Sequence, residues 1–270
     1  MPELPEIEII VQDLRRLQGK VVERIQLYSD EILRTPARYW QNCLCQKRLL
    51  AVTRKAKYIL FRLENSLKLI MHLGMTGQLL LREFPSDLPD KHTHMLIDFG
   101  TDKLYYRDIR KFGFVDLARF ENAVSDSYFK NVGYDPLEIG RETWVPLLKK
   151  SKARIKPLLL SQKLVAGLGN IYVDETLFRA GIHPKRKASQ LSTKRLAQLY
   201  DAMRLVLEEA IQNGGSSIDD YVHPDGSRGS FQLSHQVYGK EGRPCPQCGR
   251  VIKKIKLGGR GTSFCSHCQR

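Results

Sequence analysis

The sequence predicts an α+β fold in which an N-terminal helix and an antiparallel β-sandwich precede a helical region and a small metal-binding module. Three observations predict this fold. Apolar residues recur at helical spacing near the N-terminus, short strand-like runs fill residues 20 to 120, and a helical pattern after residue 151 ends in paired cysteines. With 270 residues and 42% hydrophobic content, the chain can bury the core of one large domain or of two ordinary ones.

The first element is a helix over residues 3 to 18. Apolar side chains recur there at helical spacing, at Leu4, Ile7, Ile10, Val11, Leu14 and Leu17. Pro5 suits the first turn, where a missing N–H costs nothing, and Gly19 ends the helix. The chain therefore starts with a helix that has one apolar face.

The β-sandwich is predicted over residues 20 to 120. Short runs rich in Val, Ile, Leu, Tyr and Phe alternate with turn residues, in the order VVERIQLY, KYILFRLE, LKLIMHLGM, HMLIDFG, KLYYRD and FGFVDLARF. Around residues 131 to 151 the strands stop, and glycines and prolines mark a connector. A domain boundary is expected at this connector.

The pattern then becomes helical. Pro157 suits the first turn of a helix through LLLSQKLV, and the glycines of residues 167–169 interrupt it. Asn170 can cap a second helix that continues to about Phe178. A longer helix is expected from about 192 to 212, and a polar loop follows it.

The charge balance indicates a polyanionic partner. Lys and Arg number 44 against 29 Asp and Glu, which gives a net charge of +15 and a pI near 9.6. DNA, RNA and an anionic membrane surface would all satisfy this excess. Residues 240–270 hold eight Lys or Arg against one acid, Glu241, so this module is expected to face phosphates.

The sequence contains no transmembrane or export signal. No stretch approaches the ~18 uninterrupted apolar residues that a bilayer crossing needs. The N-terminus carries Glu3, Glu6 and Glu8, and it lacks the cationic start of a secretory signal. We therefore expect a soluble intracellular protein with no membrane partner.

The last four cysteines predict a zinc site. Cys245, Cys248, Cys265 and Cys268 form the pattern C-x2-C-x16-C-x2-C, and two such pairs supply the four thiolates of a tetrahedral Zn²⁺. Two disulfides are the alternative, which an intracellular, reducing setting disfavours. We expect one structural zinc ion, and we interpret Cys43 and Cys45 as ordinary apolar residues of a helix or strand.

Three motifs together resemble the formamidopyrimidine-DNA glycosylases. They are MPELPE at residues 1–6, LVAGLGNIYVDETLFRAGIHP at 164–184 and GGRGTSFC at 258–265. The resemblance implies a bacterial base-excision repair enzyme that removes 8-oxoguanine and formamidopyrimidines from duplex DNA and cleaves abasic sites. It implies a catalytic domain over 1–132, a linker over 133–150, a helix-two-turn-helix domain over 151–235 and a zinc finger over 236–270.

Pro2 is the expected nucleophile. Removal of Met1 would expose a secondary amine at the start of a helix, and such an amine can attack a sugar carbon and form an iminium. α-Amino groups titrate near ~7.7 to 8.0 against ~10.4 for lysine, so more of the amine is unprotonated at neutral pH. The resemblance makes Glu3 the acid and base and Glu6 a supporting group, although acids in a first helical turn also simply stabilise the helix dipole.

A flipped base leaves a gap in the duplex, and apolar wedges or a planar cation can fill it. Arg110 and Phe112 lie two residues apart, so an extended segment would project both to one face, and Met75 follows a nearby strand. The resemblance implies that these three side chains fill the gap. Taken alone, each of these residue types is more often a packing residue or a surface charge.

A phosphate clamp is implied by the same resemblance, although Lys57 could also be a solvated strand charge, His72 a hydrogen-bonded strand histidine and Asn170 only a helix cap. The clamp consists of Lys57, His72, Asn170 and Arg260, of which we group Lys57 and Arg260 with Pro2 and Glu3 as catalytic residues. Arg260 is expected at a glycine-flanked hairpin tip, where its donors can reach a phosphate. Lys156 resembles a family lysine near the bound sugar or base, and a basic residue at a helix start is the alternative. The loop 216–230 matches in position the segment that covers 8-oxoguanine, but its composition identifies no contact.

Two other functions stay open. An endonuclease VIII-like glycosylase would prefer oxidised pyrimidines, but Leu4 after Pro2-Glu3 and the well-populated 214–230 loop favour purines. A non-catalytic DNA-damage-binding protein would use the zinc finger and helix pair without chemistry. We expect a monomer in the bacterial cytoplasm that acts on the nucleoid.

Overall fold

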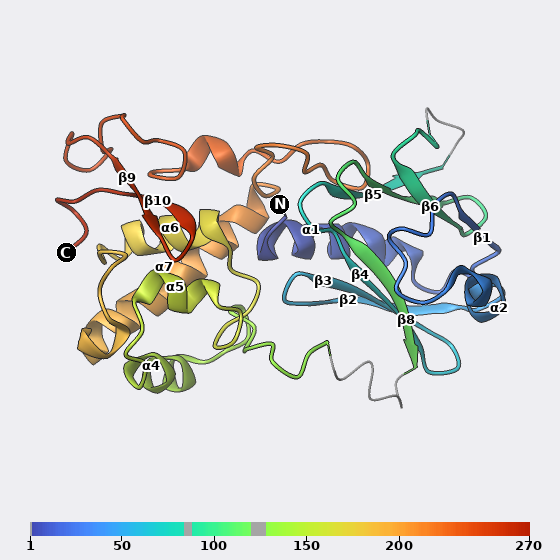
Figure 1. Ribbon diagram of the computed structural model, residues 1–270, viewed down its shortest axis with the longest axis horizontal. Coiled ribbons are helices and arrows are strands. Elements are labelled where there is room, and N and C mark those ends of the chain that lie inside the picture. The colour runs from blue at the N-terminus through green and yellow to red at the C-terminus, as the bar shows by residue number, and fades with distance from the viewer. Residues whose placement is uncertain (1, 84–87, 120–127) are drawn as a thin grey trace. The chain divides into compact units, whose positions relative to one another are not determined.

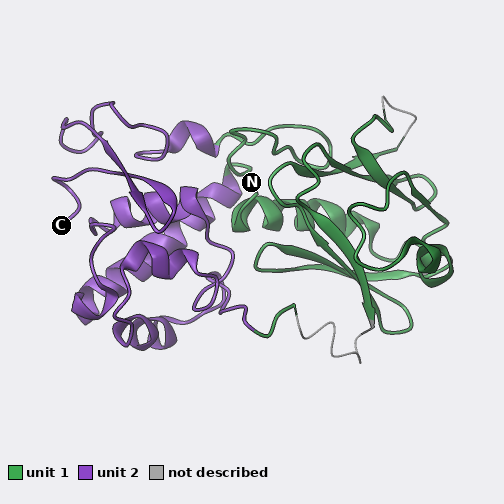
Figure 2. Ribbon diagram, viewed as in Figure 1, with its two compact units in different colours: residues 1–130, 213–230 green, residues 131–212, 231–270 purple. Residues whose placement is uncertain are grey.

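The computed structural model describes residues 2–83, 88–119 and 128–270, and these form two compact units (Figure 2). Unit 1 comprises residues 1–130 and 213–230, and unit 2 comprises residues 131–212 and 231–270.

Unit 1 begins with the predicted helix. Helix α1 spans Leu4–Leu14 and continues as the 3-10 turn η1 (Arg15–Leu17) (Figure 1). Glu3 and Glu6 form a capping box at its start, in which the Glu3 N–H donates to the Glu6 carboxylate at 2.8 Å. The apolar face of α1 is buried in the core of unit 1, as the sequence predicts.

The strands of unit 1 form two four-stranded antiparallel sheets with the orders β1-β6-β7-β5 and β2-β3-β4-β8. The strands are β1 (Arg24–Leu27), β2 (Leu49–Lys55), β3 (Tyr58–Leu63), β4 (Leu67–His72), β5 (Gly77–Arg82), β6 (Thr93–Asp98), β7 (Lys103–Asp108) and β8 (Phe114–Arg119). Each predicted run contains a strand, and β2 and β5 are strands that the sequence analysis missed.

Side-chain alternation joins the two sheets into a sandwich. On β3, Ile59 and Phe61 face the main core, which also takes Ile97 and Leu104 from the other sheet. Leu60, between them in sequence, belongs to a separate cluster on the opposite face. The predicted β-sandwich is therefore confirmed.

A short helical segment lies outside the sheets, with η2 at Ala37–Tyr39 and α2 at Trp40–Leu44. Cys43 belongs to α2 and Cys45 follows it, and both pack against the core of unit 1. These two cysteines are packing residues, as predicted.

Unit 2 contains α4 (Arg141–Lys149), α5 (Ile155–Leu160), α6 (Asn170–Arg179), α7 (Thr193–Gln212), η3 (Ala188–Gln190) and η4 (Phe231–Ser234). The connector predicted around 131 to 151 is wrong in part, because α4 forms within it despite Pro146. Trp144 is fully buried there, and its indole N–H donates to the Leu196 carbonyl of α7 at 3.2 Å. Burial of this side chain outweighs the backbone bond that the proline removes.

Residues 213–230 group with unit 1, whereas the resemblance implied a place within residues 151–235. The Leu81 N–H at the edge of β5 donates to the Pro224 carbonyl at 2.7 Å, and Tyr221 is buried in the core of unit 1. The domain boundaries implied by the resemblance remain a prediction.

The zinc module contains the hairpin of β9 (Lys253–Leu257) and β10 (Arg260–Phe264), which lies between its two cysteine pairs. Gly258 and Gly259 link the strands, and both have a positive φ, which a two-residue type I′ turn requires.

Among the described residues, no helix has the length and apolar character that crossing a bilayer takes.

Candidate active site and nucleic-acid interface

The start of α1 is a buried site organised by one carboxylate. Pro2 and Glu3 are both buried. One oxygen of Glu6 accepts the Glu3 N–H at 2.8 Å, and the other accepts the Ser216 N–H at 2.8 Å. Glu6 is 1% exposed, so these charge-assisted bonds form out of water, where they are strong. The predicted supporting residue thus joins the first peptide of the site to the segment 213–230.

The contact to Glu6 requires a glycine. Gly215 has a φ of +76°, and a Cβ built there would lie 2.9 Å from a Glu6 carboxylate oxygen. Burial, together with the nearby Glu6 charge, raises the pKa of Tyr221, so this residue is a neutral phenol at physiological pH. The segment therefore approaches the start of α1 in one defined backbone conformation.

Met75, Arg110 and Phe112 form a cluster on unit 1. The Arg110 guanidinium lies 4.4 Å from the centroid of the Phe112 ring, and one of its nitrogens lies 3.6 Å from the Met75 sulfur. Met75 is 41% exposed and Phe112 is 55% exposed. The expectation of an extended segment is wrong, because Lys111 between them has a φ of +55°. A turn, rather than strand alternation, brings the side chains together.

Asp108 holds this turn, and the sequence analysis missed it. Its carboxylate is fully buried and accepts the Gly113 N–H at 2.8 Å and the Arg110 N–H at 3.2 Å. It also accepts the Thr76 hydroxyl, next to Met75. The signal in the sequence is an aspartate at a strand end, two residues before the first N–H that it accepts.

Lys57 and His72 lie in one sheet region of unit 1, where the start of β3 pairs with the end of β4. Lys57 lies in the turn between β2 and β3, and His72 ends β4. His72 Nδ1 accepts the Gly74 N–H at 3.1 Å, which leaves the proton of the neutral ring on Nε2. Burial, reinforced by Lys57 and Arg34, lowers the pKa of His72 to about 4. At neutral pH, His72 can donate a hydrogen bond to a phosphate but adds no charge.

Lys156 lies inside unit 2. Its ammonium is 2.6 Å from the Asp174 carboxylate and donates to the Gly261 carbonyl at 2.9 Å, and the lysine is 0% exposed. Asp174 also accepts the Ser263 N–H at 3.0 Å. Burial raises the pKa of Asp174 to about 7 against the opposing effect of Lys156. The pair joins α5 and α6 to β10, the strand that begins with Arg260.

Arg260 and Asn170 occupy two ends of elements in unit 2. Arg260 is exposed and directly follows the Gly258-Gly259 turn, so the predicted hairpin position is confirmed. Asn170 is the first residue of α6, and the capping position predicted for it belongs to Gly169. Asn170 is half-buried at the helix N-terminus, where backbone N–H groups favour an anion.

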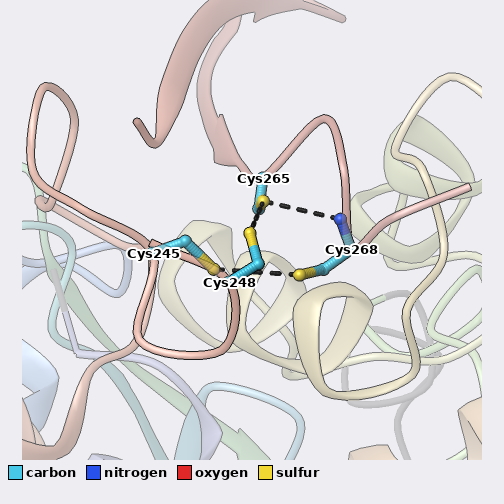
Figure 3. A group of neighbouring side chains, drawn as sticks. All are labelled: Cys245, Cys248, Cys265 and Cys268. Atoms are coloured by element: carbon cyan, nitrogen blue, oxygen red, sulfur yellow. Dashed lines mark hydrogen bonds between the residues drawn. The ribbon is translucent and has the colours of Figure 1, made fainter. Parts of the chain in front are cut away.

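The four terminal cysteines form a metal site (Figure 3). Their sulfurs lie within 4.8 Å of one another, with Cys245 to Cys268 at 3.9 Å and Cys248 to Cys265 at 3.5 Å. A tetrahedral Zn²⁺ with bonds of about 2.3 Å requires sulfur separations of about 3.8 Å. Burial disfavours the Cys265 thiolate, but the N–H groups of Cys268 and His267 outweigh it and bring its pKa to about 7. The predicted structural zinc site fits.

Two adjacent acids of α6 attach the zinc module to the helices. Asp174 accepts the Ser263 N–H, and the buried Glu175 accepts the N–H groups of residues 236–238 at 2.8 to 3.0 Å. The sequence analysis missed both acids, because nothing in residues 164–184 indicates which distant N–H groups they accept.

Three family models match successive parts of this chain. Residues 1–115 match the family model of the formamidopyrimidine-DNA glycosylase N-terminal domain. Residues 132–222 match that of the formamidopyrimidine-DNA glycosylase H2TH domain, and residues 242–270 match the zinc finger found in FPG and IleRS.

Similar curated proteins and solved structures agree. The formamidopyrimidine-DNA glycosylases of Exiguobacterium sp. and Bacillus subtilis are 42% and 39% identical, covering 100% of this chain and 100% and 99% of theirs. A Lactococcus lactis FPG mutant bound to Fapy-dG DNA superposes with a TM-score of 0.91 at 38% identity, with complete coverage of both chains. L. lactis Fpg bound to abasic-site DNA gives 0.91 at 36% identity and 99% coverage of each.

A β-sandwich with a buried acid pair at its N-terminus, together with an H2TH region and a four-cysteine zinc finger, defines a DNA-repair enzyme of the glycosylase and AP lyase class. Within that class, the chain belongs to the formamidopyrimidine-DNA glycosylase family.

Proposed function

We propose that this enzyme removes oxidised purines, namely 8-oxoguanine and formamidopyrimidines, from duplex DNA and then cleaves the strand at the abasic site. The observation that carries the proposal is the Pro2-Glu3 pair, buried at the start of α1, in a chain that matches formamidopyrimidine-DNA glycosylases over its full length. The complexes of L. lactis Fpg with Fapy-dG and abasic-site DNA support this substrate class.

Pro2 acts as the nucleophile once Met1 is removed. Its nitrogen attacks C1′ of the damaged nucleotide while the bond from C1′ to the base breaks, and the base leaves with a proton. Opening of the sugar ring gives a Schiff base between the proline nitrogen and C1′. Loss of a proton from C2′ expels the 3′ phosphate, and a second elimination expels the 5′ phosphate, so the strand is cut on both sides.

Glu3 is the acid and base of this sequence. Its carboxyl group protonates the ring oxygen as the sugar opens and then moves protons during elimination. Glu6 accepts the Glu3 backbone N–H and so fixes the position of the backbone from which the Glu3 side chain extends. The two acids therefore have separate tasks, one on the substrate and one on the backbone.

The other predicted residues bind the DNA. Lys57, His72, Asn170 and Arg260 contact phosphates, and Met75, Arg110 and Phe112 fill the gap left by the extruded nucleotide. Lys156 acts from below the surface by holding the β9–β10 hairpin. The zinc ion is structural, and we infer a monomer that works on the nucleoid in the cytoplasm.

The test uses a removable N-terminal tag whose cleavage leaves Pro2 first. Borohydride should trap a covalent adduct with 8-oxoguanine DNA only after cleavage, and peptide mapping should place the adduct on Pro2. The tagged protein is the matched control, since it differs only at the blocked amine. Excision of 8-oxoguanine by the tagged protein at the normal rate would exclude the mechanism, and preference for thymine glycol over 8-oxoguanine would exclude the purine assignment.

A second variant separates chemistry from binding. Glu3→Gln should lower the rate of base excision by about 10²- to 10⁴-fold, the range of general acid and base catalysis, and leave duplex affinity within about twofold. Single-turnover kinetics and fluorescence anisotropy measure the two quantities. An unchanged excision rate would show that Glu3 does not transfer the proton.

A further inference from the structure

A pocket of about 450 Å³ lies in unit 2 beside the start of α7, and its lining includes the zinc ligand Cys268 but none of the residues assigned above to chemistry or to DNA. Three arginines from separate segments line it. Arg186 follows α6, Arg195 lies in the first turn of α7, and Arg270 follows the last zinc ligand. We call this the arginine pocket.

Among the described residues of unit 2, no Asp or Glu side chain forms an ion pair with the three arginines of the pocket. Residues 176–200 and 242–270 contain no Asp or Glu. Three cations facing one cavity repel one another, so an anion that enters it removes an unfavourable interaction.

The guanidinium groups are partly fixed in place and still have donors to offer. Arg195 donates to the Gly181 carbonyl at 2.7 Å and to the Gln198 side chain at 3.4 Å. Arg270 donates to the His267 carbonyl at 3.4 Å. Each guanidinium has five N–H groups, so most of them remain for a ligand. The Ser192 hydroxyl accepts the Arg195 backbone N–H at 3.2 Å, so this N–H at the start of α7 is already paired.

We propose that the arginine pocket binds a phosphate group. A planar guanidinium fork matches two phosphate oxygens, and three such groups on one cavity select a multiply charged tetrahedral anion over chloride. The volume falls within the range of small-molecule sites, so a mononucleotide fits as well as inorganic phosphate. The phosphate can come from a free nucleotide or from a DNA backbone, and the two sources give different results below.

Binding is measured on the full-length, zinc-loaded protein by NMR of the arginine Nε–Hε signals. Inorganic phosphate, and separately dAMP, should shift the Arg186 and Arg195 signals saturably at constant ionic strength, where sodium chloride does not. Arg186→Gln should weaken phosphate binding about threefold to fivefold, the upper end for an exposed charge pair. Arg270→Gln should do the same.

Arg243→Gln is the matched control. Arg243 is an exposed arginine of the zinc module outside the pocket, so its loss removes the same charge but no lining group. It should change the affinity for phosphate by less than about 1.5-fold, as expected of a screened surface charge. Equal weakening by Arg186→Gln and Arg243→Gln, or shifts that never saturate, would overturn the proposal in favour of general attraction to a basic surface.

Binding of undamaged duplex DNA to the same variants then distinguishes the two sources of the phosphate. If Arg186→Gln weakens both phosphate and duplex binding and phosphate competes with the duplex, the pocket holds a backbone phosphate. If it weakens phosphate binding alone, the pocket holds a free phosphorylated molecule while DNA is bound elsewhere. Both results require the arginine pocket to bind phosphate.

Discussion

The start of α1 and the β9–β10 hairpin are two functional regions held in opposite ways. The first is the start of a helix whose apolar face is buried in the core of unit 1, and Glu6 there accepts one N–H three residues away and a second from Ser216. The hairpin belongs to a module whose own apolar cluster is small and includes Cys245 and Cys265. It depends on a metal and on contacts from α6, which lies far earlier in the sequence.

Chemistry and phosphate contact can therefore be lost separately. A small module with few apolar residues cannot offset the loss of chain entropy by burial alone, so metal coordination contributes much of its stability. The sandwich needs no such addition. Damage to the hairpin should therefore remove DNA binding and leave the catalytic end folded.

Loss of the metal is the largest expected effect. Structural zinc contributes ~10 to 16 kcal/mol in isolated finger peptides, so Cys248→Ser should unfold the module and abolish duplex binding. Unit 1 should keep its stability, because its core contains none of the four cysteine ligands. Urea unfolding followed through Trp40, in a Trp144→Phe background, measures unit 1 separately.

Cys43→Ser is the control for this variant, because Cys43 is a half-buried cysteine outside the module. It should leave both zinc content and duplex affinity unchanged. A parallel loss of stability in the Trp40 signal of Cys248→Ser would show that the two units unfold together.

The Lys156–Asp174 pair gives the next largest effect. Lys156→Met leaves a buried carboxylate without its cation, which costs about 3 to 5 kcal/mol. The double variant Lys156→Met/Asp174→Asn should recover much of this loss, because the amide oxygen still accepts the Ser263 N–H. Denaturant unfolding of unit 2, followed through Trp144, measures both. If the double variant is no more stable than the single one, the penalty does not come from the unpaired charge.

The same variant has a defined pH dependence. Burial already raises the pKa of Asp174 from 3.8 to about 7, and removing Lys156 should raise it further. The folded state then binds a proton that the unfolded state has released, so the stability of Lys156→Met should fall as pH rises from about 4 through about 7 and beyond. The double variant should show no such slope. A flat profile for the single variant would mean that water reaches Asp174.

Glu6→Gln should have a smaller effect that is local to unit 1. Glutamine keeps one accepting oxygen, so either the Glu3 or the Ser216 N–H faces an NH2 donor and loses its bond. Hydrogen bonds to charged groups contribute about 1.5 to 3 kcal/mol. If the lost bond positions the catalytic groups in the transition state, the excision rate should fall by about 10- to 150-fold. Gln12→Ala, on an exposed position of α1, is the control.

The measurement for Glu6→Gln is single-turnover excision well below the unfolding temperature, together with amide exchange at Ser216. A purely structural role would lower the unfolding temperature and speed exchange while leaving the excision rate of the folded protein unchanged. A slower rate in fully folded protein is the result expected of a positioning residue.

Much of the site could be predicted from local sequence. The cysteine spacing fixes a tetrahedral thiolate set, and two consecutive glycines before Arg260 fix a tight turn. The alternation in KYILFRLE fixes which side chains of β3 enter the core. In each case the pattern and its structural consequence lie within a few residues of one another.

The rest depended on partners distant in sequence. Lys156 was interpreted as a residue near the sugar or base, because nothing near it shows that Asp174 and Gly261 will bury its ammonium. Helix α4 forms in a proline-containing connector because Trp144 is buried and its indole N–H donates to the carbonyl of Leu196 in α7, 52 residues later in the sequence. The turn at Lys111 likewise depends on a buried aspartate that accepts N–H groups on both sides of it.

The smallest expected effect separates the two kinds of phosphate contact within unit 1. Lys57 carries a charge, whereas the low pKa of His72 makes it a neutral donor at pH 7. Lys57→Gln should therefore reduce the slope of log affinity against log salt by about 0.9, the value for one neutralised phosphate. Arg260→Gln, in unit 2, should reduce this slope by the same amount.

His72→Gln should weaken binding less than about tenfold, the effect of one lost hydrogen bond, with no change in slope. Fluorescence anisotropy with an abasic-site duplex between about 50 and 200 mM salt resolves these slopes. A slope change for His72→Gln equal to that for Lys57→Gln would mean that bound DNA raises the pKa of His72 enough to protonate it.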